Sequence, residues 1–124
     1  VYPVKAAKAD RPTRYGHAFV MRDADGDVYL QTRAEKGLLA QMTETPVSAW
    51  TATPEPVVHP LPADWRHHGQ IVHVFTHFRL ELEIWSATVN PTTLTQGWWA
   101  DPSELAAEAL PSLFRKVLIA AGLE

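Results

Sequence analysis

The stretch 67–83 contains four of the six histidines in this sequence, together with two glutamates, and such side chains can bind a metal ion or transfer a proton. Zinc sites take Cys and His ligands at short, regular spacings, and the chain has six His and no Cys. Two of the histidines are adjacent and diverge on an extended chain, and two others span an expected turn, so we expect no metal site. Two glutamates share a strand face and could pair for acid–base catalysis, but an arginine in the same row favours a solvated charged face. These side chains are His67, His68, His73 and His77, followed by Arg79, Glu81 and Glu83.

Aromatic and hydroxyl side chains offer a second kind of chemistry, which is the recognition of bases. Five tryptophans could stack on unpaired bases, as aromatic side chains do in single-strand binders. Trp98 and Trp99 point in opposite directions if they lie in a strand, so at least one of them is expected in the core. The tripeptide Phe75-Thr76-His77 by itself predicts only a hairpin corner with a buried Phe and an exposed His.

Length and composition describe one ordinary globular domain. The chain has 124 residues, of which 46% are hydrophobic and 20% charged, which is enough apolar material for a closed core. The formal net charge of −3 differs from the basic surface of proteins that hold duplex DNA unaided, so any DNA affinity should be weak. The sequence contains no leader peptide and no apolar run long enough for a membrane span, and Val1 looks like a cut made inside a longer protein.

The first half of the chain predicts a linker, a hairpin and a long loop. Residues 1–14 contain four basic residues among alanines and prolines and are expected to be a basic interdomain linker, with the domain itself at 15–124. Strands are expected at 17–22 and 28–33, because the Asp-Gly pair at Asp25-Gly26 between them favours a turn with positive φ. Five prolines within 43–65 make a long helix or regular strand pairing improbable there.

The second half predicts two strands followed by helices. Apolar and charged residues alternate after His77, and the pattern changes at Thr76-His77, which indicates a turn or bulge there. A short strand is expected at 98–100, and helices are expected to begin at Asp101 and at Pro111, the second of them ending at Gly122. Strands followed by helices make an α+β domain.

Several segments together resemble the C-terminal domain of the MutY family of adenine DNA glycosylases. No single segment is specific, but their order and spacing are. They are Tyr2-Pro3-Val4-Lys5, Val28-Tyr29-Leu30-Gln31-Thr32-Arg33, Lys36-Gly37-Leu38-Leu39, His73-Val74-Phe75-Thr76-His77-Phe78, and Leu110-Pro111-Ser112-Leu113-Phe114-Arg115-Lys116-Val117-Leu118.

The resemblance implies a Nudix-like fold, a mixed β-sheet with flanking helices, and a role in DNA repair. In the family, a Phe-Ser-His loop approaches the 8-oxoguanine that lies opposite the adenine to be removed, and Phe75-Thr76-His77 matches this loop with Thr in place of Ser. These three residues are the expected lesion-binding site. The expected partners are duplex DNA containing 8-oxoguanine opposite adenine and an N-terminal glycosylase domain of the same chain, in the bacterial cytoplasm with the chromosome.

The same resemblance implies that the chemistry lies outside this chain. In the family, the N-terminal domain flips out and hydrolyses the adenine and carries an iron–sulfur cluster, which a chain without Cys cannot hold. This fragment is therefore expected to have no catalytic residue, no metal site and no cofactor of its own.

The substitution of Thr for Ser retains the chemistry that the lesion requires. Guanine N7 is an acceptor on the major-groove edge, whereas 8-oxoguanine has a protonated N7 beside a carbonyl oxygen, so the local pattern of donors and acceptors is inverted. A hydroxyl can accept from the first group and donate to the second. We expect Thr76 and its backbone amide to contribute about 1–3 kcal/mol of discrimination.

Two other functions compete with this hypothesis. A Nudix hydrolase needs a helix with clustered glutamates that hold divalent cations. If Gly37 begins the Nudix motif, only Glu55 fits among its five charged positions, and two prolines interrupt the helix. The other alternative is a partner-binding module, because residues 110–114 are similar to a sliding-clamp peptide. Their apolar stripe continues down the helix, however, which favours packing into the domain's own sheet. The residues at the five charged positions are Thr43, Thr51, Ala52, Glu55 and Pro56.

Overall fold

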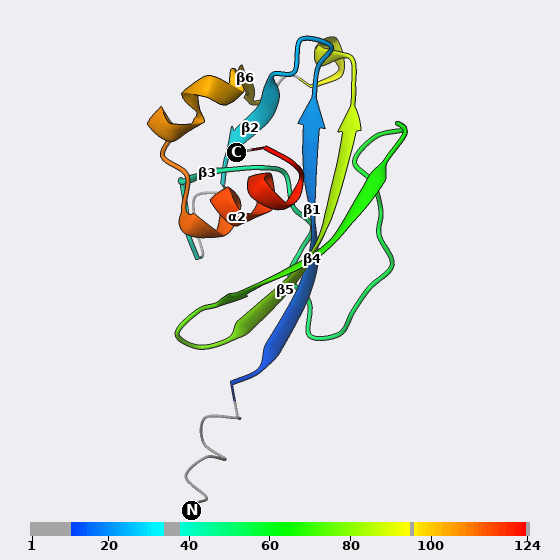
Figure 1. Ribbon diagram of the computed structural model, residues 1–124. Coiled ribbons are helices and arrows are strands. Elements are labelled where there is room, and N and C mark those ends of the chain that lie inside the picture. The colour runs from blue at the N-terminus through cyan, green and yellow to red at the C-terminus, as the bar shows by residue number, and fades with distance from the viewer. Residues whose placement is uncertain (1–10, 34–37, 95, 124) are drawn as a thin grey trace, which may run out of the picture.

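A mixed six-stranded sheet forms the centre of the protein, in the order β3-β2-β1-β5-β4, with β6 beside β2. The computed structural model describes residues 11–33, 38–94 and 96–123. One α-helix, α2, lies against the sheet (Figure 1), so the expected α+β class is confirmed. The elements are β1 (Thr13–Arg22), β2 (Val28–Thr32), β3 (Thr43–Glu44), β4 (Arg66–Val74), β5 (Arg79–Thr88), η1 (Pro91–Thr93), β6 (Trp98–Ala100), η2 (Pro102–Ala107) and α2 (Ser112–Ala120).

The longest strands, β1 and β5, pair in parallel from Thr13 and Arg79 to Arg22 and Thr88, and β4 pairs with β5 in an antiparallel hairpin. The alternation expected after His77 is confirmed, since Leu80 and Leu82 are fully buried while the charged residues of β5 lie on the other face. Strand β5 therefore has one face in the core and, near the loop, one polar face.

The β1–β2 hairpin is confirmed, with Gly26 at φ 88° in its turn and Arg22 opposite Val28. The first strand begins at Thr13, four residues earlier than expected, because its pairing with β5 extends that far. Thr13 and Arg14 are therefore part of the sheet rather than of the expected linker. Residues 1–10 of that linker lie outside the described residues.

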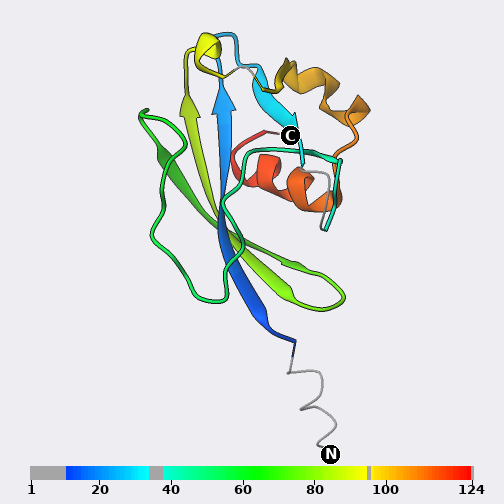
Figure 2. The same cartoon turned by 180° about the vertical axis from the view of Figure 1, so that it is seen from behind.

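The loop 43–65 contains no helix and only short strand pairing, as its prolines predict. It pairs with β1 where β2 has turned away: Val47 bridges to Ala18, and Thr51 bridges to Tyr15. Further along, the loop passes over the face of the sheet that α2 does not cover (Figure 2), where Trp65 packs edge-on against Phe19 at 5.6 Å. This irregular segment thus completes both the sheet and its second apolar layer.

The two faces of the sheet have separate cores, and α2 covers the larger one. The helix buries Leu113 and Phe114, which confirms that residues 110–114 pack into the domain. It ends before Gly122, at φ 98°, as expected. The helix expected at Asp101 is the 3₁₀ helix η2, whose first turn the Asp101 carboxylate caps. The residue before Pro111 disfavours helical geometry, so a helix that begins at Asp101 has to be short.

The predicted strand at 98–100 is confirmed as β6, and its two tryptophans face opposite cores. Trp98 packs against the core beneath α2, whereas Trp99 packs against the smaller core on the other face, 5.5 Å from Tyr29. Both rings are half-buried. Their large apolar surfaces therefore contribute to packing at the edge of the sheet.

Candidate nucleic-acid interface

The four-residue loop 75–78 joins β4 to β5 and presents a polar tip to solvent. The predicted turn at Thr76-His77 is confirmed, and both residues are exposed. The Phe75 amide donates a hydrogen bond to the Phe78 carbonyl at 2.8 Å, which closes the loop at its base. The loop therefore has a defined backbone, and its two outermost side chains face water.

An aromatic cluster beneath this tip fixes the loop to the core. The Phe75 ring lies 4.9 Å from the Phe78 ring and 5.9 Å from the Trp50 ring, between centroids, and all three pack against the buried core. A Cβ atom on Gly16 would stand 2.9 Å from Trp50 Cδ1, so only glycine at this position of β1 admits the indole. The aromatic side chain of the tripeptide is thus an anchor, while its hydroxyl and imidazole remain at the surface.

Two arginines lie over the same aromatic cluster. The Arg14 guanidinium stands 5.3 Å from the Phe78 ring centroid, and that of Arg33 stands 4.8 Å from the Trp50 ring. Both distances are within the range of favourable cation–π contact. Local sequence patterns do not single out Arg14, Arg33 or Trp50, because their proximity to the tripeptide depends on strand pairing and on the course of an irregular loop.

Glu44 holds Arg33 in place from beneath. Glu44 is 5% exposed, and its carboxylate accepts from Arg33 at 2.8 Å and from Gln31 at 2.6 Å. Burial raises the pKa of Glu44, and the hydrogen bonds from Gln31 and Arg33 together with the positive charge of Arg33 act in the opposite direction. The Arg33 Nε–H group also donates to the Leu38 carbonyl at 3.1 Å. The Arg33 guanidinium is thus oriented by its hydrogen bonds to Glu44 and Leu38 and by its contact with the Trp50 indole.

His73 is the penultimate residue of β4, just before the loop 75–78. Its ring lies edge-on to Phe75 at 4.8 Å, and its Nδ1 atom lies 3.0 Å from Lys116 Nζ on α2. Burial lowers the pKa of His73, and the Lys116 ammonium lowers it further. The imidazole is therefore held in its neutral form, accepting from the lysine.

Three basic residues lie near the 75–78 loop, one of which pairs with Glu81 at 3.2 Å, and a group of carboxylates lies at the far end of the sheet. Arg14, Arg79 and Lys116 lie near the 75–78 loop, although the whole chain has a net charge of −3. At the far end of β1 the turn 23–27 meets the start of η2, and the pKa of Asp27 is raised by burial and by the carboxylates around it. A polyanion would be repelled least at the end of the sheet that carries the 75–78 loop. The carboxylates around Asp27 are those of Asp23, Asp25, Asp101 and Glu104.

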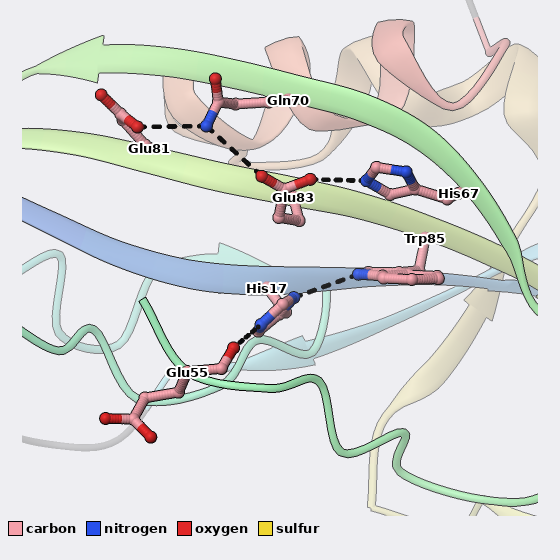
Figure 3. A network of polar contacts seen from close by, with 7 residues as sticks. All are labelled: His17, Glu55, His67, Gln70, Glu81, Glu83 and Trp85. Carbon is pink, nitrogen blue, oxygen red and sulfur yellow. Dashed lines mark hydrogen bonds and ion pairs between the residues drawn. The ribbon is translucent and has the colours of Figure 1, made fainter. Parts of the chain in front are cut away.

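The two glutamates considered for acid–base chemistry lie on the face away from α2, in a network of polar contacts (Figure 3). The Gln70 amide donates to Glu81 at 3.1 Å and to Glu83 at 3.3 Å, and Glu83 also pairs with His67. His68 instead contacts Ser86 Oγ at 2.6 Å, so the two adjacent histidines diverge as expected. Both glutamates are half-buried and linked to the neighbouring strand.

His17 connects this face to the long loop above it (Figure 3). The Trp85 indole can only donate, so its contact with His17 Nδ1 at 3.1 Å makes that atom the acceptor. The proton of the neutral ring is then on Nε2, which donates to the Glu55 carbonyl at 2.9 Å. These two contacts fasten the 43–65 loop to β1 and account for His17 as a structural residue.

Among residues 11–33, 38–94 and 96–123, no three His, Asp or Glu side chains come together as a metal ion would require. In the same part of the chain no helix combines the length and the apolar character that a membrane crossing demands.

Comparisons with known proteins identify the family and the fold. The model of the NUDIX domain matches residues 17–120, whereas a comparison with curated proteins finds no match. The chain is similar in structure to the C-terminal domain of mouse MUTYH, solved in complex with human PCNA, with a TM-score of 0.68, 23% identity, and coverage of 87% of this chain and 86% of that one.

Two further solved structures share the fold. A MutT protein from Methanosarcina mazei has a TM-score of 0.68 and 15% identity, with 89% of this chain and 93% of that chain covered. The Nudix hydrolase RenU from M. smegmatis has a TM-score of 0.51 and 14% identity, with 92% and 88% covered. At such identities the structural likenesses establish the fold, and function has to be argued from the site.

Proposed function

This chain belongs to the NUDIX domain family, and we propose that it is the lesion-recognition domain of a MutY-type adenine DNA glycosylase. In this proposal the loop 75–78 contacts 8-oxoguanine opposite adenine in duplex DNA, with Thr76 reading the damaged base and Phe75 and His77 completing the site. The observation that carries the proposal is a hairpin loop that is closed by a backbone hydrogen bond and anchored by aromatic packing, with its hydroxyl and imidazole side chains exposed at the tip.

Recognition of a base requires polar side chains that are exposed and held in a fixed position. A hydroxyl that must both accept from N7–H and donate to the C8 carbonyl oxygen needs a fixed position, because hydrogen bonds weaken steeply with misalignment. The aromatic anchor and the closing backbone bond hold Thr76 in place before DNA arrives. Little conformational entropy then remains to be lost on binding.

The charge distribution supports the same orientation on DNA. The basic side chains near the loop would face the phosphates, and the acidic turn 23–27 would point away from them. Such a modest patch gives weak binding by itself. A covalently linked glycosylase domain would compensate by raising the effective concentration of this domain at the lesion.

The course of residues 43–58 favours recognition over hydrolysis of a nucleotide. A Nudix hydrolase holds its cations on a glutamate-bearing helix, but here Thr43 lies buried in β3 and Thr51 bridges to β1. Glu55 is exposed and uses its backbone carbonyl to accept from His17. The segment that should be a catalytic helix is therefore extended and serves to complete the sheet.

The proposal includes a division of labour within a longer protein. Base flipping costs a few kcal/mol, and a domain that stabilises only the complex with 8-oxoguanine makes that cost selective. Hydrolysis of the adenine bond and the iron–sulfur cluster would belong to an N-terminal domain, and the protein would act in the cytoplasm at the chromosome. The similarity in fold to the C-terminal domain of mouse MUTYH supports this arrangement.

The test compares Thr76→Ala with the unaltered residue in the full-length parent. Adenine release is measured from duplexes that present 8-oxoguanine or guanine opposite adenine. We expect the preference for 8-oxoguanine to fall by about 1–3 kcal/mol, the worth of one base-edge contact, while cleavage of a bound lesion slows less. Thr76→Ser is the matched control, because it retains the hydroxyl and should retain the preference.

Two outcomes would contradict the proposal. An equal loss of activity on both templates would remove Thr76 from lesion recognition. Turnover of a nucleoside triphosphate by this chain, dependent on a divalent metal ion, would instead establish the hydrolase.

A further inference from the structure

A shallow cleft lies beside the 75–78 loop, near the start of β1. Five residues that matter to its chemistry line it: Arg14, Arg33, Leu38, Trp50 and Phe78. Trp50 and Phe78 also belong to the aromatic cluster that anchors the loop, so the cleft and the loop share one support. A ligand held by the loop would therefore also reach the cleft.

The guanidinium groups of the two arginines at the cleft lie over aromatic rings. A cation–π contact does not use up the N–H donors of a guanidinium, so donors without another partner are available to a ligand. Arg33 uses Nε and one terminal nitrogen on Leu38 and Glu44. Arg14 makes no ion pair with any carboxylate among the described residues, and it is exposed. Donors in a fixed plane are suited to the oxygens of a phosphate group.

The charge of the cleft matches a ligand with one negative charge. The carboxylate of Glu44 balances the charge of Arg33 at 2.8 Å, which leaves the charge of Arg14. A phosphodiester in a nucleic-acid backbone has one negative charge per phosphate. It would accept from both arginines without disturbing the buried Glu44.

From this geometry we propose that the cleft between Arg14 and Arg33 binds a backbone phosphate of the DNA whose lesion the 75–78 loop contacts. The inference rests on the proposed function and adds to it a site for the sugar–phosphate backbone. Binding a phosphate in this cleft would fix the position of the duplex relative to Thr76. Phosphate contacts of this kind determine register and orientation and carry no sequence information.

A stacked nucleobase fits the cleft less well than a phosphate does. One face of the Phe78 ring is beneath Arg14, and one face of the Trp50 indole is beneath Arg33. Trp50 is also stacked on Phe75, with 26° between the ring planes. The aromatic surface is thus already covered, whereas the edges of the guanidinium groups are available.

The first experiment measures the salt dependence of duplex binding by this chain. We expect Arg14→Gln to weaken binding roughly fivefold to tenfold at low salt and to lower the slope of log affinity against log salt by about 0.9, the value for one phosphate contact. The loss should be equal for duplexes with 8-oxoguanine and with guanine. Arg66→Gln is the matched control, since Arg66 is an exposed arginine at the opposite end of β4 from the loop.

The second experiment locates the phosphate. Neutral methylphosphonates replace single phosphates on either side of the lesion, one position at a time. We expect one position to weaken binding of the unaltered chain at least as much as Arg14→Gln does, and to cause a clearly smaller further loss in the Arg14→Gln chain, where only Arg33 still contacts that phosphate. Such non-additivity identifies two groups in direct contact. An abasic residue at the neighbouring nucleotide should leave binding unchanged.

The outcomes separate this inference from the proposed function. If Arg14→Gln changes binding no more than Arg66→Gln while Thr76→Ala still removes the lesion preference, the phosphate site is wrong and lesion recognition stands. If the salt slope falls but neither duplex is preferred, the cleft binds DNA and the proposed specificity is wrong. Loss of binding with the abasic residue would replace the phosphate by a base. No binding to either duplex at low salt would overturn the phosphate site, whereas lesion recognition is decided by the Thr76→Ala comparison in the full-length parent.

Discussion

The turns at the two ends of the sheet use their polar groups in opposite ways. In the turn 23–27 the Asp23 carboxylate accepts from the backbone amides of Asp25 and Asp27, and the Arg22 guanidinium donates twice to the Gly26 carbonyl. In the loop 75–78 one backbone hydrogen bond closes the hairpin, and aromatic packing on Trp50 provides the rest of the support. Hydrogen bonds from its own side chains hold the turn 23–27 together, whereas packing against the core holds the loop 75–78.

This difference shows which end of the molecule is suited to recognition. Where side chains hold the turn together, they are no longer available to a ligand. Where apolar anchors hold it, the side chains at the tip remain free to form hydrogen bonds, as Thr76 and His77 are in the proposed complex. Loops supported by a rigid scaffold are frequent sites of binding for this reason. The contrast makes specific predictions about stability.

The largest effect is expected from Phe75→Ala, which removes the anchor of the recognition loop. The ring is half-buried among Trp50, Phe78 and His73. We expect the free energy of unfolding to fall by about 2–3 kcal/mol, somewhat less than for a fully buried Phe, and the preference for 8-oxoguanine to be lost with the loop geometry. Urea denaturation measures the first effect, and duplex binding measures the second. Phe75→Leu should restore most of the stability, and a loss no larger than that of an exposed side chain would show that the core does not hold this loop.

The next largest effect on stability is expected at Gly26, in the turn 23–27. Its φ of 88° is unfavourable for any residue with a Cβ atom, and that atom would stand 3.2 Å from an Arg22 guanidinium nitrogen. We expect Gly26→Ala to lower the unfolding free energy by about 1–2 kcal/mol and to leave duplex binding unchanged. Asp25→Ala is the control at an exposed neighbour. Weakened lesion binding in Gly26→Ala would mean that the two ends of the sheet are coupled.

A smaller effect on the unfolding free energy is expected from pH, and the pH range of this effect differs between the two ends of the sheet. The folded pKa of His73 is lowered from the ordinary 6.5 by burial and by Lys116, so its contribution is complete above pH 6.5 and is lost as the pH falls towards the folded value. The pKa of Asp101 is lowered from 3.8 by its hydrogen bonds with Ser103, so its contribution is lost only at more acidic pH. We expect the unfolding free energy to decrease between about pH 7.5 and about pH 5.5.

The variant His73→Gln identifies the group responsible for that decrease. It should flatten the change between neutral and mildly acidic pH, and Lys116→Gln should reduce it in part, because the second cause of the lowered pKa is removed. Asp101→Asn should leave this window as it is and act at lower pH. An unchanged profile in His73→Gln would assign the pH dependence to another histidine.

The smallest effect on stability is expected at the tip itself. Thr76 is exposed, so Thr76→Ala should change the unfolding free energy by no more than about 0.5 kcal/mol. Thermal or urea denaturation of the two chains provides the comparison. Together with a lost preference for 8-oxoguanine, an unchanged stability would separate recognition from folding. A loss comparable to that of Phe75→Ala would show that the hydroxyl supports the loop after all.

Most elements followed from local patterns in the sequence, and the candidate site followed only in part. The alternation after His77, the Asp-Gly turn and the apolar stripe from Leu113 are each encoded within a few residues, so strands, hairpin and helix were predictable. The start of β1 was placed too late, because its first residues are strand only through pairing with β5.

The sequence by itself determined which face of each strand is apolar, where the chain turns, and which tripeptide lies at the corner between the last long strands. These properties depend on neighbours in the chain and on the conformations that Gly and Pro permit. Only the tertiary structure decided that Trp50 lies above Gly16, that Glu44 orients Arg33, and that Arg14 reaches the ring of Phe78. The pairing of β2 with β3 brings Glu44 to Arg33. The other two contacts join residues far apart in the sequence, and they form only when the parallel pairing of β1 with β5 and the path of the 43–65 loop bring those residues together.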